Sequence, residues 1–195
     1  MESLLYKPAS YLQPLSPAQL FSRDLPLEVE LGCGDGTFLI SYASLKPEIN
    51  FIGVERLLGR IRKVDRKGGR AGLGNLKLVR LEASYFVEFL LPPRSTQAIH
   101  IYFPDPWPKR RHWKNRLINE GFLRSCAKAL RPEGFVHVRT DNQPYFQHMV
   151  EAFTTVALFK AVQPPAELLS VRTDFEKEFH SRGLPTLAAS YCLMS

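Results

Sequence analysis

Cysteine is scarce in this sequence, and its few cysteines are scattered. Cys33, Cys126 and Cys192 are odd in number, and no Cys-x-x-Cys pair or cluster of histidine and cysteine has the spacing of metal ligands. These counts argue against a disulfide framework and against a zinc site. We therefore expect a fold that is held by an ordinary hydrophobic core, and no bound metal.

Long hydrophobic runs are also missing. No apolar segment approaches the roughly 20 residues that a membrane-spanning helix requires. Pro8, Pro14 and Pro17 interrupt the N-terminal segment, which lacks the apolar core of a signal peptide. The sequence therefore predicts no membrane association and a location in the reducing cytoplasm.

Acidic residues are outnumbered by basic ones. The chain has 26 lysines and arginines against 19 aspartates and glutamates, a net charge of +7. A basic balance favours a polyanionic partner, either a nucleic acid or an anionic membrane surface. The 195 residues, 45% of them hydrophobic, suit one folded domain over residues 1–195.

Short apolar runs alternate with segments of helical periodicity. The runs predict strands at residues 27–31, 51–54, 76–81, 98–103 and 135–139. Helices are expected at residues 38–45, 57–66, 85–91, 116–130 and 144–153, and edge strands with a loop are expected after residue 163. This alternation predicts a doubly wound α/β fold, with a mostly parallel sheet and helices on both faces.

A glycine-rich turn follows the first predicted strand. Its sequence is Glu30-Leu31-Gly32-Cys33-Gly34-Asp35-Gly36, and glycines at a helix start let the backbone approach a ligand closely. Thr37 stands where a dinucleotide fingerprint has its third glycine. The turn instead resembles the S-adenosylmethionine loop of Rossmann-like methyltransferases. The alternative is a plain glycine turn between a strand and a helix, with no ligand.

Two further acids follow the next two predicted strands. Glu55 comes about 20 residues after the turn, where an acid commonly binds ribose hydroxyls. Glu82 precedes Ala83, and its carboxylate is a candidate acceptor for an adenine amino group. Together with Glu30, these acids would repel a pyrophosphate, which favours a sulfonium cofactor over NAD.

The fourth predicted strand runs into a stiff, proline-rich loop. Residues 102–112 read YFPDPWPKRRH, and three prolines in five residues preorganise the backbone around Asp105 and Trp107. Trp107 would stack on a base or pack on the body of the protein. His112 is a candidate general base, but a surface histidine in a basic loop is the simpler interpretation.

This loop resembles the FPDPWPKxRH signature of bacterial tRNA (guanine-N7-)-methyltransferases, and the resemblance extends from Glu30 to about Glu176. It implies a class I methyltransferase fold, S-adenosyl-L-methionine as cofactor and tRNA as partner, in a monomer or a homodimer. Asp105 would be the catalytic residue. The implied cofactor-binding residues are Glu30, Gly32, Gly34, Glu55, Glu82, Ala83 and Asp105. Lys109, Asp141, Thr173 and Glu176 would contact the guanosine or order the site around it.

Two positions depart from the family pattern. Glu82 replaces the usual aspartate, which keeps the hydrogen-bonding chemistry, and Asn115 stands where arginine is usual. Two basic patches are candidates for contact with RNA phosphates. The first comprises Arg56, Arg60, Arg62, Lys63, Arg66, Lys67 and Arg70, and the second Lys109, Arg110, Arg111, Lys114 and Arg116.

Other functions remain open at this point. The run Asp105-Pro106-Trp107-Pro108 also resembles the loop of methyltransferases that act on exocyclic amines of adenine or cytosine, but it lacks their second consecutive proline. A small-molecule methyltransferase, an RNA-binding module without catalysis and a nicotinamide dehydrogenase are further alternatives.

Overall fold

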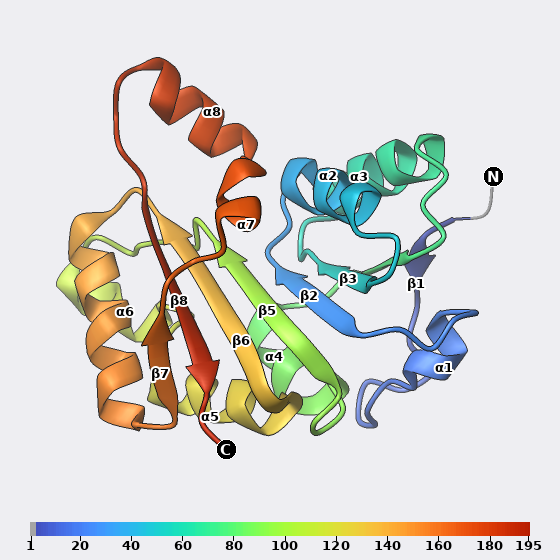
Figure 1. Ribbon diagram of the computed structural model, residues 1–195, viewed down its shortest axis with the longest axis horizontal. Helices are drawn as coiled ribbons and strands as arrows, with labels where there is room; N and C mark the ends of the chain where they lie inside the picture. Colours follow the sequence, from blue (N-terminus) through green and yellow to red (C-terminus); the bar gives the residue numbers. More distant parts are fainter. Residues whose placement is uncertain (1–2) are drawn as a thin grey trace.

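One eight-stranded sheet forms the centre of the computed structural model, which describes residues 3–195 (Figure 1). The strands lie in the order β1-β4-β3-β2-β5-β6-β8-β7. Their bounds are β1 (Leu5–Tyr6), β2 (Leu27–Leu31), β3 (Asn50–Val54), β4 (Leu76–Val79), β5 (Thr96–Tyr102), β6 (Leu130–Thr140), β7 (Phe159–Val162) and β8 (Leu187–Leu193). Among the described strands, β8 pairs antiparallel with both β6 and β7, and every other pair is parallel. The predicted mostly parallel sheet is confirmed.

Helices cover both faces of this sheet, each over its own hydrophobic cluster. One face carries α2 (Thr37–Leu45), α3 (Leu58–Arg70) and α7 (Ala166–Ser170), and the other carries α5 (Glu120–Ala129) and α6 (Gln143–Val156) (Figure 1). The shorter elements are α1 (Pro17–Leu20), α4 (Ala83–Tyr85), the π-helix η1 (Phe86–Leu90), the 3-10 helix η2 (Arg110–Asn115) and α8 (Asp174–Ser181). Among the described residues, no helix has the length and hydropathy to cross a membrane.

Strand β2 shows how the sequence produces two buried faces. Its residues LEVEL are all buried, and Val29 and Leu31 belong to the cluster beneath α5 and α6. Because side chains alternate along a strand, Glu28 and Glu30 point to the opposite face. A buried carboxylate requires a partner, and Glu28 Oε2 lies 2.8 Å from Nε2 of the equally buried His100.

The order of the strands places a ligand site. The chain winds outward from β2 to β3 and β4, and then crosses back to β5 on the other side of β2. Sheets of this kind bind ligands outside the carboxyl ends of their strands, where the winding reverses. The turn after β2 and the loop after β5 therefore face the same crevice.

Most predicted helices and strands differ from the observed ones in their bounds, α3 for example continuing to Arg70 and β4 ending at Val79, and three further differences are informative. The helix expected over residues 116–130 begins only at Glu120, because the Asn119 side chain caps it by accepting a hydrogen bond from Phe122 N at 3.1 Å. The segment at 85–91 is a short α-helix followed by the π-helix η1. The strand expected at 135–139 extends over Leu130–Thr140.

The two ends of the chain hold most of what sequence periodicity missed. The edge strands expected past residue 163 are wrong: among the described residues that stretch holds helices α7 and α8 and one strand, β8, which inserts between β6 and β7, while the edge strand β7 lies before residue 163. At the other end, β1 was not predicted. It adds an edge strand beside β4, and Asp65 on α3 holds it by accepting a hydrogen bond from Leu4 N at 2.7 Å.

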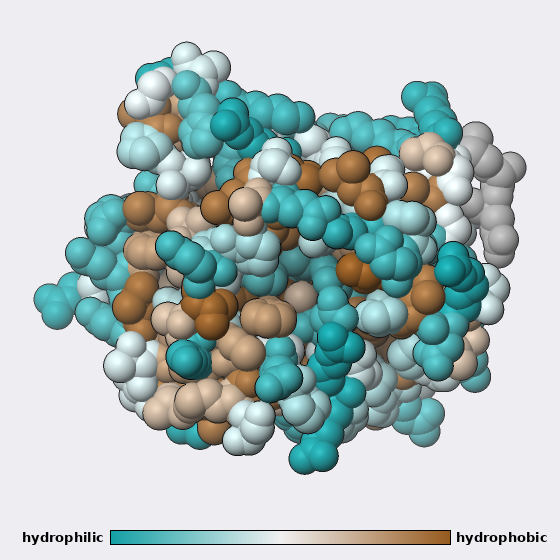
Figure 2. All heavy atoms as spheres, viewed as in Figure 1, coloured by the Kyte–Doolittle hydropathy of each residue, from teal (hydrophilic) through white to brown (hydrophobic). Residues whose placement is uncertain are grey.

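The distribution of hydrophilic and hydrophobic residues on the surface follows the arrangement of the helices and strands. In Figure 2, hydrophilic residues line the upper rim, where α8, α2 and α3 lie, and hydrophobic residues gather at lower left over β7 and β8. The upper rim is also the carboxyl edge of the parallel strands, where the candidate site lies.

Candidate functional site

Two adjoining cavities lie at the carboxyl edge of the sheet. The first, of about 360 Å³, reaches from β3 and α4 to the loop after β5. The second, of about 280 Å³, lies over the glycine turn and reaches α8. Both are lined by Gly32, Arg60, Tyr102 and Phe103, so they form one continuous site.

The glycine turn adopts a conformation that needs its glycines. Gly32, Gly34 and Gly36 all have positive φ, at 73°, 55° and 75°. At Gly36 a Cβ atom would also lie 2.6 Å from the Val64 side chain of α3. Beside Gly32 the space is open, so its backbone can approach a ligand.

Glu30 presents an unpaired acid to this turn. Its side chain is buried, it lines the second cavity, and its Oε2 has no hydrogen-bond partner within the described residues. Burial raises the pKa of Glu30 from 4.5 to about 8, and nearby Arg139 opposes that rise while Glu55 adds to it. A buried acceptor that faces a cavity is suited to a cationic or hydrogen-bond-donating ligand group.

Glu55 and Glu82 line the first cavity, and both also bind backbone. Glu55 accepts hydrogen bonds from Gly34 N at 3.1 Å and from Leu57 N at 2.7 Å, so it ties the glycine turn to β3. The exposed Glu82 caps α4 by accepting from Ser84 N and Tyr85 N at 3.0 and 2.8 Å. Each carboxylate oxygen retains a second lone pair, so the predicted contacts with ribose and adenine remain predictions.

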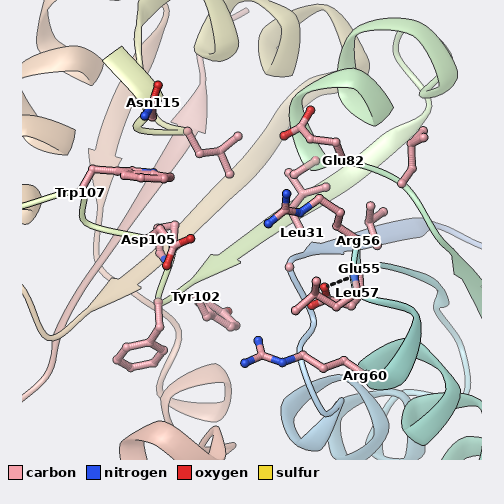
Figure 3. A pocket seen from close by; sticks show the side chains of 17 residues that line it. Leu31, Glu55, Arg56, Leu57, Arg60, Glu82, Tyr102, Asp105, Trp107 and Asn115 are labelled. Atoms are coloured by element: carbon pink, nitrogen blue, oxygen red, sulfur yellow. Dashed lines mark hydrogen bonds between the residues drawn. The ribbon is translucent and has the colours of Figure 1, made fainter. Parts of the chain in front are cut away.

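The loop after β5 forms the opposite wall. Figure 3 shows Asp105 and Trp107 on one side of the first cavity, with Glu55 and Glu82 across from them. Phe103 and Trp107 have positive φ, 52° and 44°, which is strained for bulky side chains. The loop therefore holds an acid and an indole in a fixed, costly conformation beside the cavity.

The four predicted substrate-binding residues occupy different places. Thr173 lines the second cavity, and its side chain caps α8 by accepting from Glu176 N at 3.1 Å. Glu176 is buried behind the cavity rather than lining it. Lys109 and Asp141 are exposed at the carboxyl edge and line neither cavity.

Arg139, for which the sequence predicted no role, organises this region. It is buried near the end of β6, and its guanidinium donates to Glu176 Oε2 at 2.8 Å and to the carbonyls of Val171 and Leu168 at 2.9 and 2.6 Å. Its Cζ lies 4.2 Å from the ring centroid of Tyr102. A charged residue within an apolar strand was the available signal in the sequence.

In the described residues, no cluster of three or more His, Cys, Asp or Glu side chains could hold a metal ion.

The sequence matches a known family over most of its length. A family model described as a putative methyltransferase matches residues 24–189. The tRNA (guanine-N(7)-)-methyltransferase of Chromohalobacter salexigens is 35% identical over 84% of this chain and 68% of its own length. That of Rubrobacter xylanophilus is 33% identical over 92% of this chain and 82% of its own length.

The chain belongs to the family of tRNA (guanine-N(7)-)-methyltransferases. The resemblance carried by the loop after β5 is thereby confirmed, and the chain is an enzyme of the methyltransferase class.

Solved structures confirm the class I methyltransferase fold. The 16S rRNA methyltransferase KamB has a TM-score of 0.67 at 18% identity, covering 94% of this chain and 96% of its own. The [4+2]-cyclase SpnF has a TM-score of 0.60 at 10% identity, covering 91% and 79%. Since a cyclase shares it, the fold alone does not set the reaction.

Breaking the Arg139–Glu176 pair should destabilise the fold. We expect Arg139→Met to lower the free energy of unfolding by about 3–5 kcal/mol, because it leaves Glu176 buried without a counter-charge. The double variant Arg139→Met/Glu176→Gln should regain much of this loss, since glutamine keeps the α8 cap without a charge. Urea unfolding of both variants and of Glu176→Gln alone measures this, and a double variant as unstable as Arg139→Met would contradict it.

Proposed function

We propose that this protein transfers a methyl group from S-adenosylmethionine to N7 of the variable-loop guanosine of tRNA. The observation that carries the proposal is a single continuous site that joins the glycine turn to Asp105. The family relatives are named for this reaction, and the loop signature that predicts it forms one wall of the site.

The residues around the cavities fit this cofactor. The unpaired Glu30 Oε2 is a suitable acceptor for the ammonium of the methionine part, beside the open backbone of Gly32 and Gly34. Glu55, Glu82 and Ala83 line the first cavity, where the ribose and adenine would bind. When bound, the cofactor supplies an electrophilic methyl group on a sulfonium.

The chemistry at N7 asks little of the protein besides alignment. Guanine N7 has a free lone pair at neutral pH and no proton to lose, so a strong general base is unnecessary. Asp105 lines the first cavity and would accept hydrogen bonds from the N1 and amino edge of guanine, while its charge would offset the positive charge that develops on the ring. Trp107 lines the same cavity and offers a face for stacking.

The surface around the site supports an RNA substrate. On α3, Ile61, Val64 and Gly68 face the core, so its basic residues point outward. The exposed ones are Arg60, Arg62, Lys63, Arg66, Lys67 and Arg70. Arg56 and Arg60 also line the first cavity, and Figure 3 shows both extending toward it from the wall opposite Asp105. Basic side chains that continue from a cavity onto a helix suit a nucleotide with its flanking phosphates. Lys109, Asp141 and Thr173 are proposed to contact the guanosine, with Glu176 ordering α8 behind them.

The decisive experiment identifies the product. Incubation with labelled S-adenosylmethionine and unmodified tRNA, followed by digestion, should yield 7-methylguanosine. The label should be lost when the variable-loop guanosine is replaced by adenosine. A methylated amine of adenine or cytosine would overturn the proposed reaction in favour of the exocyclic-amine class, and absence of product would overturn the proposed substrate.

Asp105→Ala should separate catalysis from cofactor binding. We expect nearly all turnover to be lost, while the cofactor dissociation constant changes by less than about tenfold, or roughly 1.4 kcal/mol. Asp24→Ala is the matched control, because Asp24 is an exposed acid that lines neither cavity. Equal losses of turnover and of cofactor affinity would mean that Asp105 mainly holds the cofactor.

Cofactor binding should release a proton from Glu30. With its pKa near 8, the free carboxyl is largely protonated at pH 7, and a bound ammonium would favour the ionised form. Calorimetry at pH 7 in buffers of different ionisation enthalpy should show the release of about one proton, fading as the pH rises above 8. Glu30→Gln should remove the buffer dependence and weaken binding, and a buffer-independent wild-type enthalpy would rule out this linkage.

A further inference from the structure

Arg116 differs from the rest of the basic segment in which it lies. Residues 109–111 and Lys114 are exposed, whereas Arg116 retains only 3% of its surface. Arg116 was predicted to contact RNA phosphates together with its basic neighbours, and its burial corrects that prediction. Its side chain points inward, beneath the loop that carries Asp105.

Two aromatic rings enclose the guanidinium of Arg116. Its Cζ lies 4.5 Å from the ring centroid of Trp113 in η2 and 4.9 Å from that of Tyr145 in α6. The Tyr145 ring is itself fixed, because it is fully buried and its hydroxyl accepts a hydrogen bond from Ile118 N at 3.2 Å. None of the ion pairs among residues 3–195 includes Arg116. The rings therefore provide its main electrostatic partners.

Within residues 3–195, the one hydrogen bond of this side chain is to the loop. Arg116 Nε donates to the carbonyl of Pro106 at 2.9 Å. That carbonyl belongs to the peptide between Pro106 and Trp107, one residue after Asp105. The backbone of residues 104–108, all within the described chain, makes no other hydrogen bond, since three of its five residues are prolines without an N–H.

The loop needs such an anchor. Trp107 is held at a positive φ of 44°, a conformation that costs roughly 1–3 kcal/mol for a residue other than glycine and persists only when the surroundings enforce it. The Arg116 bond fixes the peptide immediately before Trp107. It thereby restrains the Asp105 carboxylate on one side and the Trp107 ring on the other.

We propose that Arg116 is a positioning residue, which sets Asp105 and Trp107 in their places through the Pro106 carbonyl. The catalytic consequence of this role rests on the proposed function, whereas the hydrogen bond that anchors the loop does not. A planar guanidinium suits the position because it lies between two rings and donates from its edge, which a lysine ammonium cannot do.

The first test measures the anchor without any need for activity. The sequence has two tryptophans, Trp107 and Trp113, so Trp113→Phe leaves Trp107 as the only one. In that background, Arg116→Met should increase quenching of Trp107 by acrylamide at least twofold. The matched control is Arg131→Met, an exposed arginine near the start of β6, at the opposite edge of the sheet.

The second test measures catalysis in the otherwise native chain. A displacement of about 1 Å at a reacting group costs up to 100-fold in rate, so we expect Arg116→Met to lower kcat by 10- to 100-fold. The KM for tRNA and the cofactor dissociation constant should stay within about threefold. Methylguanidinium should restore part of kcat to Arg116→Ala, and methylammonium should not. If Arg116→Met fails to fold, Arg116→Lys replaces it in both tests with the same expected direction.

The outcomes separate this proposal from its rivals. Unchanged quenching and kcat with a raised KM for tRNA would overturn it and make Arg116 a phosphate contact. Unchanged quenching and kcat with a lower unfolding midpoint would overturn it in favour of simple core packing. Increased quenching in a protein whose wild type methylates no tRNA would support the anchor while the proposed function fails.

Discussion

The buried ion pair between Arg139 and Glu176 is the interaction on which the rest of the site depends. Arg139 lies on β6, within the sheet, whereas Glu176 lies on α8, which is not part of the sheet. Through this pair and two carbonyl bonds, one side chain fixes α7 and α8, and the start of α8 lines the second cavity. The same guanidinium lies against Tyr102 and opposes the high pKa of Glu30. The position of α8, the packing of Tyr102 and the pKa of Glu30 thus all depend on one cation.

Local sequence patterns predicted the parts of the fold whose determinants are local. The strand LEVEL, the glycine turn and the start of α6 each depend on neighbouring residues, and all appear close to the expected positions. The insertion of β8 between β6 and β7, and the packing of α8, depend on contacts between residues far apart in the chain. Periodicity carries no information about such contacts, which explains why the C-terminal region was expected to be less structured than it is.

The site residues show the same division. Position at or after the carboxyl end of a strand was enough to place Glu30, Glu55, Glu82 and Asp105 around one crevice. It did not reveal that Glu55 and Glu82 already bind backbone N–H groups, so that the acids expected to bind a ligand also shape the wall that receives it. Nor did it distinguish the buried Arg116 from its exposed neighbours, because a run of basic residues does not indicate which member points inward.

The contact between Asp65 and the N-terminal strand has a consequence beyond holding that strand. Asp65 is the one acid within α3, and its carboxylate is turned toward Leu4 and Ser3. The outward face of the helix is thereby left mainly cationic, although Lys63 lies 3.4 Å from the Asp35 carboxylate of the glycine turn. The field of such a face extends over a Debye length of about 8 Å at physiological ionic strength. A polyanion that approaches this side would be attracted and turned before any contact forms, which raises the rate of productive encounter rather than the strength of the final complex.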